Sequence, residues 1–136
     1  EADLKKVIDK VPPSNYQKAL FVIQENSRTL KAAKAIEDND LKKLGALIYQ
    51  SHQGLSNQYK VSCDELDFLV NQAKKNKHVL GARMMGGGFG GCTINLIAKS
   101  EAKAFIETVS KVYKNKFNKA CSTYLIKLEK GTHIVK

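Results

Sequence analysis

The feature that most constrains this chain is a cluster of glycines near residue 90. Five of the nine glycines occupy the six positions from Gly86 to Gly91, interrupted only by Phe89. Glycine adopts positive φ and lets the backbone approach another group closely, at a cost of roughly 0.5–1 kcal/mol relative to alanine in a regular element. Since two residues suffice to close a hairpin, five glycines favour a loop that contacts a ligand or another backbone. The alternative is a tight or flexible hairpin loop.

The segments on both sides of the cluster predict strands. His78–Met85 and Gly91–Ala98 are short apolar runs rich in β-compatible residues. Gly86, Gly88 and Gly91 satisfy the dinucleotide pattern G-x-G-x-x-G, but that pattern requires a helix directly after the glycines. A P-loop is also excluded, because no Lys-Ser or Lys-Thr follows. The spacing therefore indicates an anion-binding or backbone-binding loop between two strands.

Helical periodicity predicts a long helix near the N-terminus. A short amphipathic segment over residues 1–11 ends at Pro12-Pro13, because proline cannot continue a helix. A capping-box pattern beginning at Ser14 then opens a helix that runs to about Glu37. Its inward face is predicted to carry Tyr16, Leu20, Ile23, Ser27 and Leu30.

Two more helices precede the strands. Asn39 or Asp40 caps one that ends near Gln58. A second capping box at Ser62 opens the helix Cys63–Asn76. The apolar side of the first of these two helices is predicted to carry Leu41, Leu44, Ile48, His52 and Leu55.

After the strands, Ser100 is predicted to cap a helix to about Phe117, and Ser122–Leu128 and Thr132–Val135 read as extended. This order predicts an α+β fold, with a ferredoxin-like antiparallel sheet, helices on one face and an N-terminal helical extension.

At 136 residues and 43% hydrophobic residues, the chain has the size and composition of a single domain. We expect a helical extension over residues 1–61 and an α-β-β-α-β unit over 62–136. The first residue, Glu1, suggests removal of an upstream segment, although an expression boundary would look the same.

The net charge of +10 raises the question of nucleic acid. Only Arg28 and Arg83 among the 23 cations are arginines, whereas phosphate and base recognition favours the bidentate guanidinium. The excess lies mostly after residue 97, at solvent-exposed helical spacing, so we expect a lysine-rich surface and no nucleic-acid partner. No apolar run long enough for a membrane span and no secretory leader occurs. We therefore expect a soluble, cytoplasmic protein with no membrane partner.

Other reactive side chains have ordinary structural explanations. His52 lies on an apolar stripe and is expected to be a hydrogen-bonded core residue. Acids in a first helical turn favour capping and the helix dipole, which explains Asp64, Glu65 and Asp67. Cys92, a candidate modifiable thiol, is expected to be buried in its strand. Arg83 precedes the glycines and contacts either a phosphate or a carboxylate. The three cysteines lack metal-ligand spacing to histidine, so we expect no metal site.

The stretch from Gly81 to Cys92, GARMMGGGFGGC, closely resembles the C-terminal glycine signature of galactokinases, which belong to the GHMP kinase superfamily. Further galactokinase-like patterns lie upstream: Glu25-Asn26-x-Arg28, Ser51-His52-x-x-Leu55 and Tyr59-x-Val61-Ser62-Cys63-x-Glu65-Leu66-Asp67. The resemblance covers roughly residues 14–98 strongly.

The resemblance implies ATP- and Mg²⁺-dependent transfer of a phosphoryl group to the anomeric hydroxyl of galactose. In the family, the phosphate loop, the catalytic aspartate and most sugar contacts lie in the N-terminal half. This chain then resembles the C-terminal domain, without a catalytic residue of its own, and its partners are its own N-terminal kinase domain, galactose and ATP. The resemblance also implies that the loop lines the active-site cleft through Gly86, Gly87, Gly88, Phe89, Gly90 and Gly91, and that Arg83 and Met85 flank it.

Met85 departs from the family, whose members usually carry Thr or Ser there, so a hydroxyl is replaced by a thioether. The alternatives are another GHMP sugar kinase, a non-catalytic galactokinase-like sensor of sugar and ATP, or an interaction domain with a relic loop.

Overall fold

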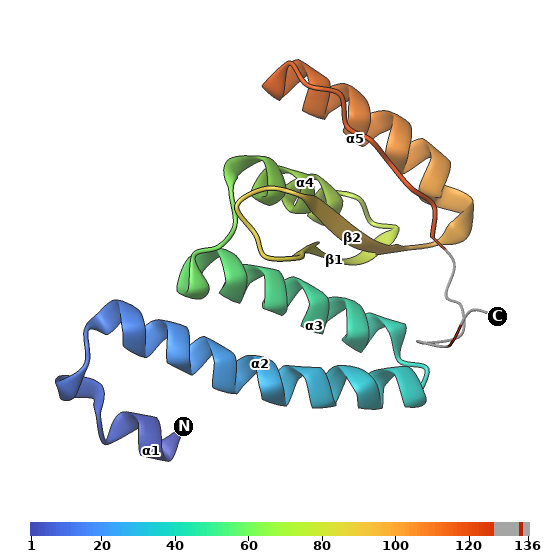
Figure 1. The fold of residues 1–136 in the computed structure, drawn as a ribbon. Coiled ribbons are helices and arrows are strands. Elements are labelled where there is room, and N and C mark those ends of the chain that lie inside the picture. Colours follow the sequence, from blue (N-terminus) through green and yellow to red (C-terminus); the bar gives the residue numbers. More distant parts are fainter. Residues whose placement is uncertain (127–133, 135–136) are drawn as a thin grey trace.

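The structure is a computed structural model that describes residues 1–126 and Ile134. Four helices precede a β-hairpin and one helix follows it (Figure 1). They are α1 (Ala2–Lys5), α2 (Pro13–Glu37), α3 (Leu41–Gly54), α4 (Asp64–Lys75), β1 (Val79–Met85), β2 (Cys92–Ile97) and α5 (Ala102–Phe117). Short turns connect them: the 3-10 turns η1 (Ile8–Lys10) and η3 (Lys99–Glu101), and the π-helical turn η2 (Leu55–Tyr59).

The sequence places the helices within a few residues of their bounds, but not always by the expected cap. Asp40 caps α3 as predicted, since its carboxylate accepts a hydrogen bond of 2.9 Å from the backbone N–H of Lys43. The cap predicted at Ser14 is wrong: α2 already begins at Pro13, whose fixed φ and missing N–H suit the first helical position. Ser100 is not a cap either, because it lies inside η3.

The β-hairpin is antiparallel, with Met85 opposite Cys92 at the end that carries the glycines. In residues 1–126 the sheet has these two strands, and 121–126 form neither helix nor strand, so the predicted strand Ser122–Leu128 is wrong over its described part. The rest of that prediction, and Thr132–Val135 except for Ile134, lie outside the described residues. The α+β class is confirmed.

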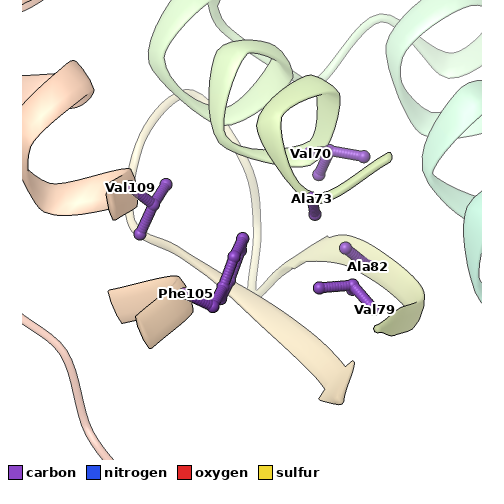
Figure 2. Packing of buried hydrophobic residues seen from close by; sticks show 6 residues of the cluster. All are labelled: Val70, Ala73, Val79, Ala82, Phe105 and Val109. Atoms are coloured by element: carbon purple, nitrogen blue, oxygen red, sulfur yellow. The ribbon is translucent and has the colours of Figure 1, made fainter. Parts of the chain in front are cut away.

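One face of the hairpin holds the main core. The cluster combines two residues each from α4, β1 and α5, and Figure 2 shows them gathered between these elements: Val70, Ala73, Val79, Ala82, Phe105 and Val109. Burying a Val- or Phe-sized side chain contributes about 1.5–3 kcal/mol. Both helices of the C-terminal unit therefore cover one face of the sheet, as predicted.

The helical extension covers the other side of β1, where α2 and α3 lie side by side (Figure 1). Here the backbones of α3 and β1 touch: a Cβ added to Gly81 would lie 2.6 Å from the carbonyl oxygen of Gly45. Two glycines are thus required at this crossing, since no side chain fits between helix and strand.

The inward face of α2 differs from the prediction. Tyr16 is buried, but Ile23, Ser27 and Leu30 are exposed, and Phe21 is buried instead. The ring of Phe21 lies against Gly54, where a Cβ would come within 2.5 Å of it. A side chain at this position of α3 would therefore leave no room for the ring of Phe21.

Candidate functional site

The loop Gly86–Gly91 joins β1 to β2 with a strongly left-handed backbone. Five of its six residues have positive φ: Gly86, Gly88, Phe89, Gly90 and Gly91. Four of these are glycines, the residue type that adopts such angles without steric cost. The backbone conformation of the loop thus explains the presence of these four glycines without reference to a ligand.

One side of this loop is anchored and the other is open. A Cβ on Gly88 would collide with the carbonyl oxygen of Val61, and the N–H of Phe89 donates a 2.7 Å hydrogen bond to that same oxygen. A Cβ on Gly86, Gly87 or Gly90 would meet nothing within 4 Å. The loop therefore contacts another backbone at its middle, while Gly87 faces open space.

A hydrogen-bonded network lies directly behind the first half of the loop. His52, which is 5% exposed, accepts a 3.2 Å hydrogen bond at Nδ1 from the backbone N–H of Met84. Its Nε2 lies 3.1 Å from the carboxylate of Asp67. Since Nδ1 accepts, Nε2 carries the proton and donates to that carboxylate. His52 is a buried, hydrogen-bonded residue, as predicted.

Burial lowers the pKa of His52, because the low-dielectric interior disfavours the imidazolium form. Asp67 opposes this shift, and the positive charges of Lys74 and Arg83 reinforce it. The neutral ring is the form that can accept the N–H of Met84, so the electrostatics and the hydrogen bond agree.

The predicted capping box at Ser62 is replaced by contacts to Asp67. Ser62 donates a 2.5 Å hydrogen bond to Asp67 Oδ1, and Ser56 donates one of 2.9 Å to Oδ2. The N-cap of α4 is Cys63, without a side-chain cap bond. Capping and the helix dipole therefore explain only part of the role of Asp67. Its hydrogen bonds to Ser56 and Ser62 are not predicted from the sequence. The presence of Ser62 and Asp67 in the same galactokinase-like pattern, Tyr59 to Asp67, was the one available indication of such a contact.

A second network supports the strand before the loop. Glu25 on α2 pairs with Arg28 and accepts a hydrogen bond from Ser51 on α3. Arg83 Nη1 lies 3.7 Å from Glu25 Oε1, and its Nε donates a 2.9 Å hydrogen bond to the carbonyl oxygen of Met84. The carboxylate contact, one of the two alternatives for Arg83, is thus present in the structure.

A cavity of about 340 Å³ opens beside the other end of the loop. Its walls are Cys63, Glu65, Leu66, Leu69, Phe89, Gly90, Gly91, Tyr113 and Lys119. Lys119 Nζ lies 2.9 Å from Glu65 Oε1, and this hydrogen bond lowers the pKa of Glu65. Phe89, which is 77% exposed, forms part of the rim.

The two residues that flank the loop, Met85 and Cys92, are both exposed. Met85 is 45% exposed at the end of β1. Cys92 is exposed as well, so its predicted burial is wrong: it lies at the hairpin end, opposite the exposed Met85. In residues 1–126, no group of three or more His, Cys, Asp or Glu side chains could hold a metal ion. Within the part of the chain that the structure describes, no helix is long and apolar enough to cross a membrane.

The fold and the site together consist of an antiparallel hairpin with a glycine-rich loop, and α4 and α5 pack on one face of this hairpin. This combination can be compared with known protein families. The sequence matches the family GHMP kinases C terminal over residues 32–115, more than half of the chain, and the chain belongs to this family.

Within that family, the similar proteins include galactokinases. The galactokinase of Clostridium beijerinckii is 42% identical over 120 residues, which cover 88% of this chain and 31% of that protein. The Lactobacillus helveticus galactokinase is 44% identical over 116 residues, covering 85% and 30%. The resemblance inferred from the glycine signature is thus confirmed. The chain spans about a third of the length of these relatives.

Solved structures of kinases are similar to this chain as well. The crystal structure of Lactococcus lactis galactokinase complexed with galactose matches with a TM-score of 0.85 at 37% identity, covering 90% of this chain and 32% of that one. The L. major mevalonate kinase in complex with R-mevalonate matches with a TM-score of 0.64 at 27% identity, covering 82% and 32%.

Proposed function

We propose that this chain is the C-terminal lobe of a galactokinase, and that Gly86–Gly91 contributes to ATP-dependent phosphorylation of galactose at the anomeric hydroxyl. The observation that carries the proposal is the loop itself: it is fixed from behind by Val61 and open in front at Gly87. The galactokinase similarity over most of the chain supports the substrate.

The chemistry available to such a loop is positioning. Phosphoryl transfer depends mostly on holding the reactants in line and stabilising charge. Backbone N–H groups in a left-handed loop can face an anion, and the missing side chains at Gly86 and Gly87 leave room for a phosphate to approach. The residues therefore fit a role beside bound ATP.

In residues 1–126 no group of three or more potential metal-ligating side chains occurs, and Mg²⁺ in kinase sites is usually held by one or two carboxylates together with the substrate phosphates. Following the galactokinase resemblance, we assign the metal, the main phosphate loop and the catalytic base to the N-terminal part of a longer polypeptide, with which this lobe would form the cleft. A cytoplasmic location accords with the proposed substrates.

The test is an activity assay on two forms of the protein. The full-length polypeptide should convert galactose and ATP to galactose 1-phosphate, whereas the purified 136 residues should convert none. Turnover by the 136 residues would contradict the lobe assignment. A full-length protein that binds galactose and ATP without turnover would be the sensor, and one that phosphorylates another substrate in preference to galactose would be a different GHMP kinase.

A further inference from the structure

We propose that Asp67 is a positioning residue for the glycine loop, holding both the backbone that enters the loop and the backbone that supports its middle. This inference deepens the proposed function and rests on it for its effect on catalysis. Asp67 is on α4, is partly exposed, and has no direct contact with the loop.

The first connection runs through His52 to the start of the loop. Asp67 Oδ1 accepts the Nε2 proton of His52, which fixes the tautomer whose Nδ1 is free to accept the N–H of Met84. Met84 is two residues before Gly86. Without the carboxylate, the ring loses the partner that fixes its rotation and tautomer, and the hydrogen bond to Met84 loses its support.

The second connection runs through the turn that precedes α4. Asp67 accepts hydrogen bonds from Ser56, inside the π-helical turn η2, and from Ser62. Between these serines the chain reverses at Lys60, which has a positive φ of 60°, and Val61 presents its carbonyl oxygen to Phe89. Asp67 thus hydrogen-bonds to residues on both sides of Val61, whose carbonyl oxygen accepts the N–H of Phe89 in the loop.

A carboxylate suits this position because three donors converge on it. An ionised Asp has two oxygens and about four acceptor sites, enough for His52, Ser56 and Ser62 together. An Asn retains one acceptor oxygen and can keep part of the network, whereas a Leu of similar size keeps none.

The experiment compares three variants of the full-length protein: Asp67→Leu, Asp67→Asn and the matched control Asp64→Leu. Asp64 is exposed, carries the same charge and lies in the same first turn of α4, so the control reproduces the charge and helix-dipole changes. Amide hydrogen–deuterium exchange is measured by mass spectrometry on peptides from residues 84–92 and from α2. Turnover of galactose is measured in parallel, with kcat and KM determined separately.

Asp67→Leu should accelerate exchange over residues 84–92 by about tenfold, the factor that corresponds to roughly 1.4 kcal/mol and is close to the lower end of what a hydrogen bond to a charged group contributes. Exchange in α2 should stay unchanged, Asp67→Asn should restore most of the protection, and Asp64→Leu should behave as the unmodified protein. The kcat should fall in the same order, with a smaller change in KM.

Unchanged exchange over 84–92 in Asp67→Leu would overturn the proposal, and so would an increase of equal size in α2, which would indicate general destabilisation. Local acceleration without any change in kcat would support the positioning role and count against the proposed function, so the two can fail separately.

Discussion

Two adjacent glycines, Gly87 and Gly88, should respond in opposite ways to the same substitution. At Gly88 the backbone has a φ of +88° and a new Cβ would collide with the carbonyl oxygen of Val61. At Gly87 the φ is not in the left-handed region and a Cβ would meet nothing within 4 Å. Gly88→Ala is therefore a structural change, and Gly87→Ala is structurally harmless.

The magnitudes follow from these two environments. A left-handed conformation costs a non-glycine residue about 1–2 kcal/mol, and the forced shift of a packed backbone adds about 1–3 kcal/mol. The reduced entropy of the unfolded chain returns about 0.4–1 kcal/mol. Gly88→Ala should thus lower the free energy of unfolding by about 1–4.6 kcal/mol, whereas Gly87→Ala should leave it unchanged or raise it by up to about 1 kcal/mol.

Urea denaturation of the 136-residue chain, followed by circular dichroism, measures both values. With a slope of about 2 kcal/mol per molar urea, the midpoint for Gly88→Ala should fall by roughly 0.5–2.3 M. In the full-length protein, Gly87→Val should lower kcat strongly while the midpoint stays near that of the unmodified protein. Equal midpoints for Gly88→Ala and the unmodified chain would refute the close contact with Val61, and unchanged kcat in Gly87→Val would refute the ligand-facing role.

Three further predictions concern other parts of the chain. Gly81→Ala should cost about 3 kcal/mol or more in unfolding free energy, measured by urea denaturation, because its Cβ would meet the backbone of Gly45. Because burial lowers the folded-state pKa of His52, the unfolded chain binds the proton more readily, and the free energy of unfolding should fall as pH drops below about 6.5. Cys92, which is exposed, should react with a thiol reagent faster than Cys121, which is partly buried and whose pKa is raised by burial, as mass spectrometry of the labelled peptides would show.

Each of these predictions has an internal comparison. The control for Gly81→Ala is Ala46→Gly, at an exposed position beside Gly45. This variant exchanges the same two residue types in α3 and changes helix propensity, but it creates no clash between α3 and β1. For pH, the difference in unfolding free energy between the unmodified chain and His52→Gln should narrow between pH 7 and pH 5, and a constant difference would contradict it. For the thiols, faster labelling of Cys121 would contradict the exposure of Cys92.

Local patterns predicted those parts of the fold that depend on neighbouring residues. The hairpin strands and the burial of His52 followed from periodicity and composition, because an alternating or helical pattern directly reports a covered face. The backbone requirement for glycine in the loop was also visible, since positive φ is a local property.

Features that depend on distant contacts were not predictable in this way. Asp67 has three partners from separate segments, so its first-turn position on α4 suggested only a cap. The periodicity predicts Leu30 on the inward face of α2, but Leu30 is exposed and Phe21 is buried against Gly54 of α3 instead. Cys92 lies exposed at the hairpin end, which the strand pattern alone does not reveal.

The contact between Gly45 of α3 and Gly81 of β1 lies at nearly the same distance from the hydrogen bond between His52 and Met84 along both elements. From Gly45 to His52 the helix rises about 10.5 Å over seven residues, and from Gly81 to Met84 the strand advances about 10 Å over three. The two backbones therefore arrive together at the hydrogen bond between His52 and Met84. A rotation of about 5° at the crossing would displace the imidazole by roughly 0.9 Å, more than a hydrogen bond tolerates. Two residues without side chains thus control the geometry at the base of the loop from a distance.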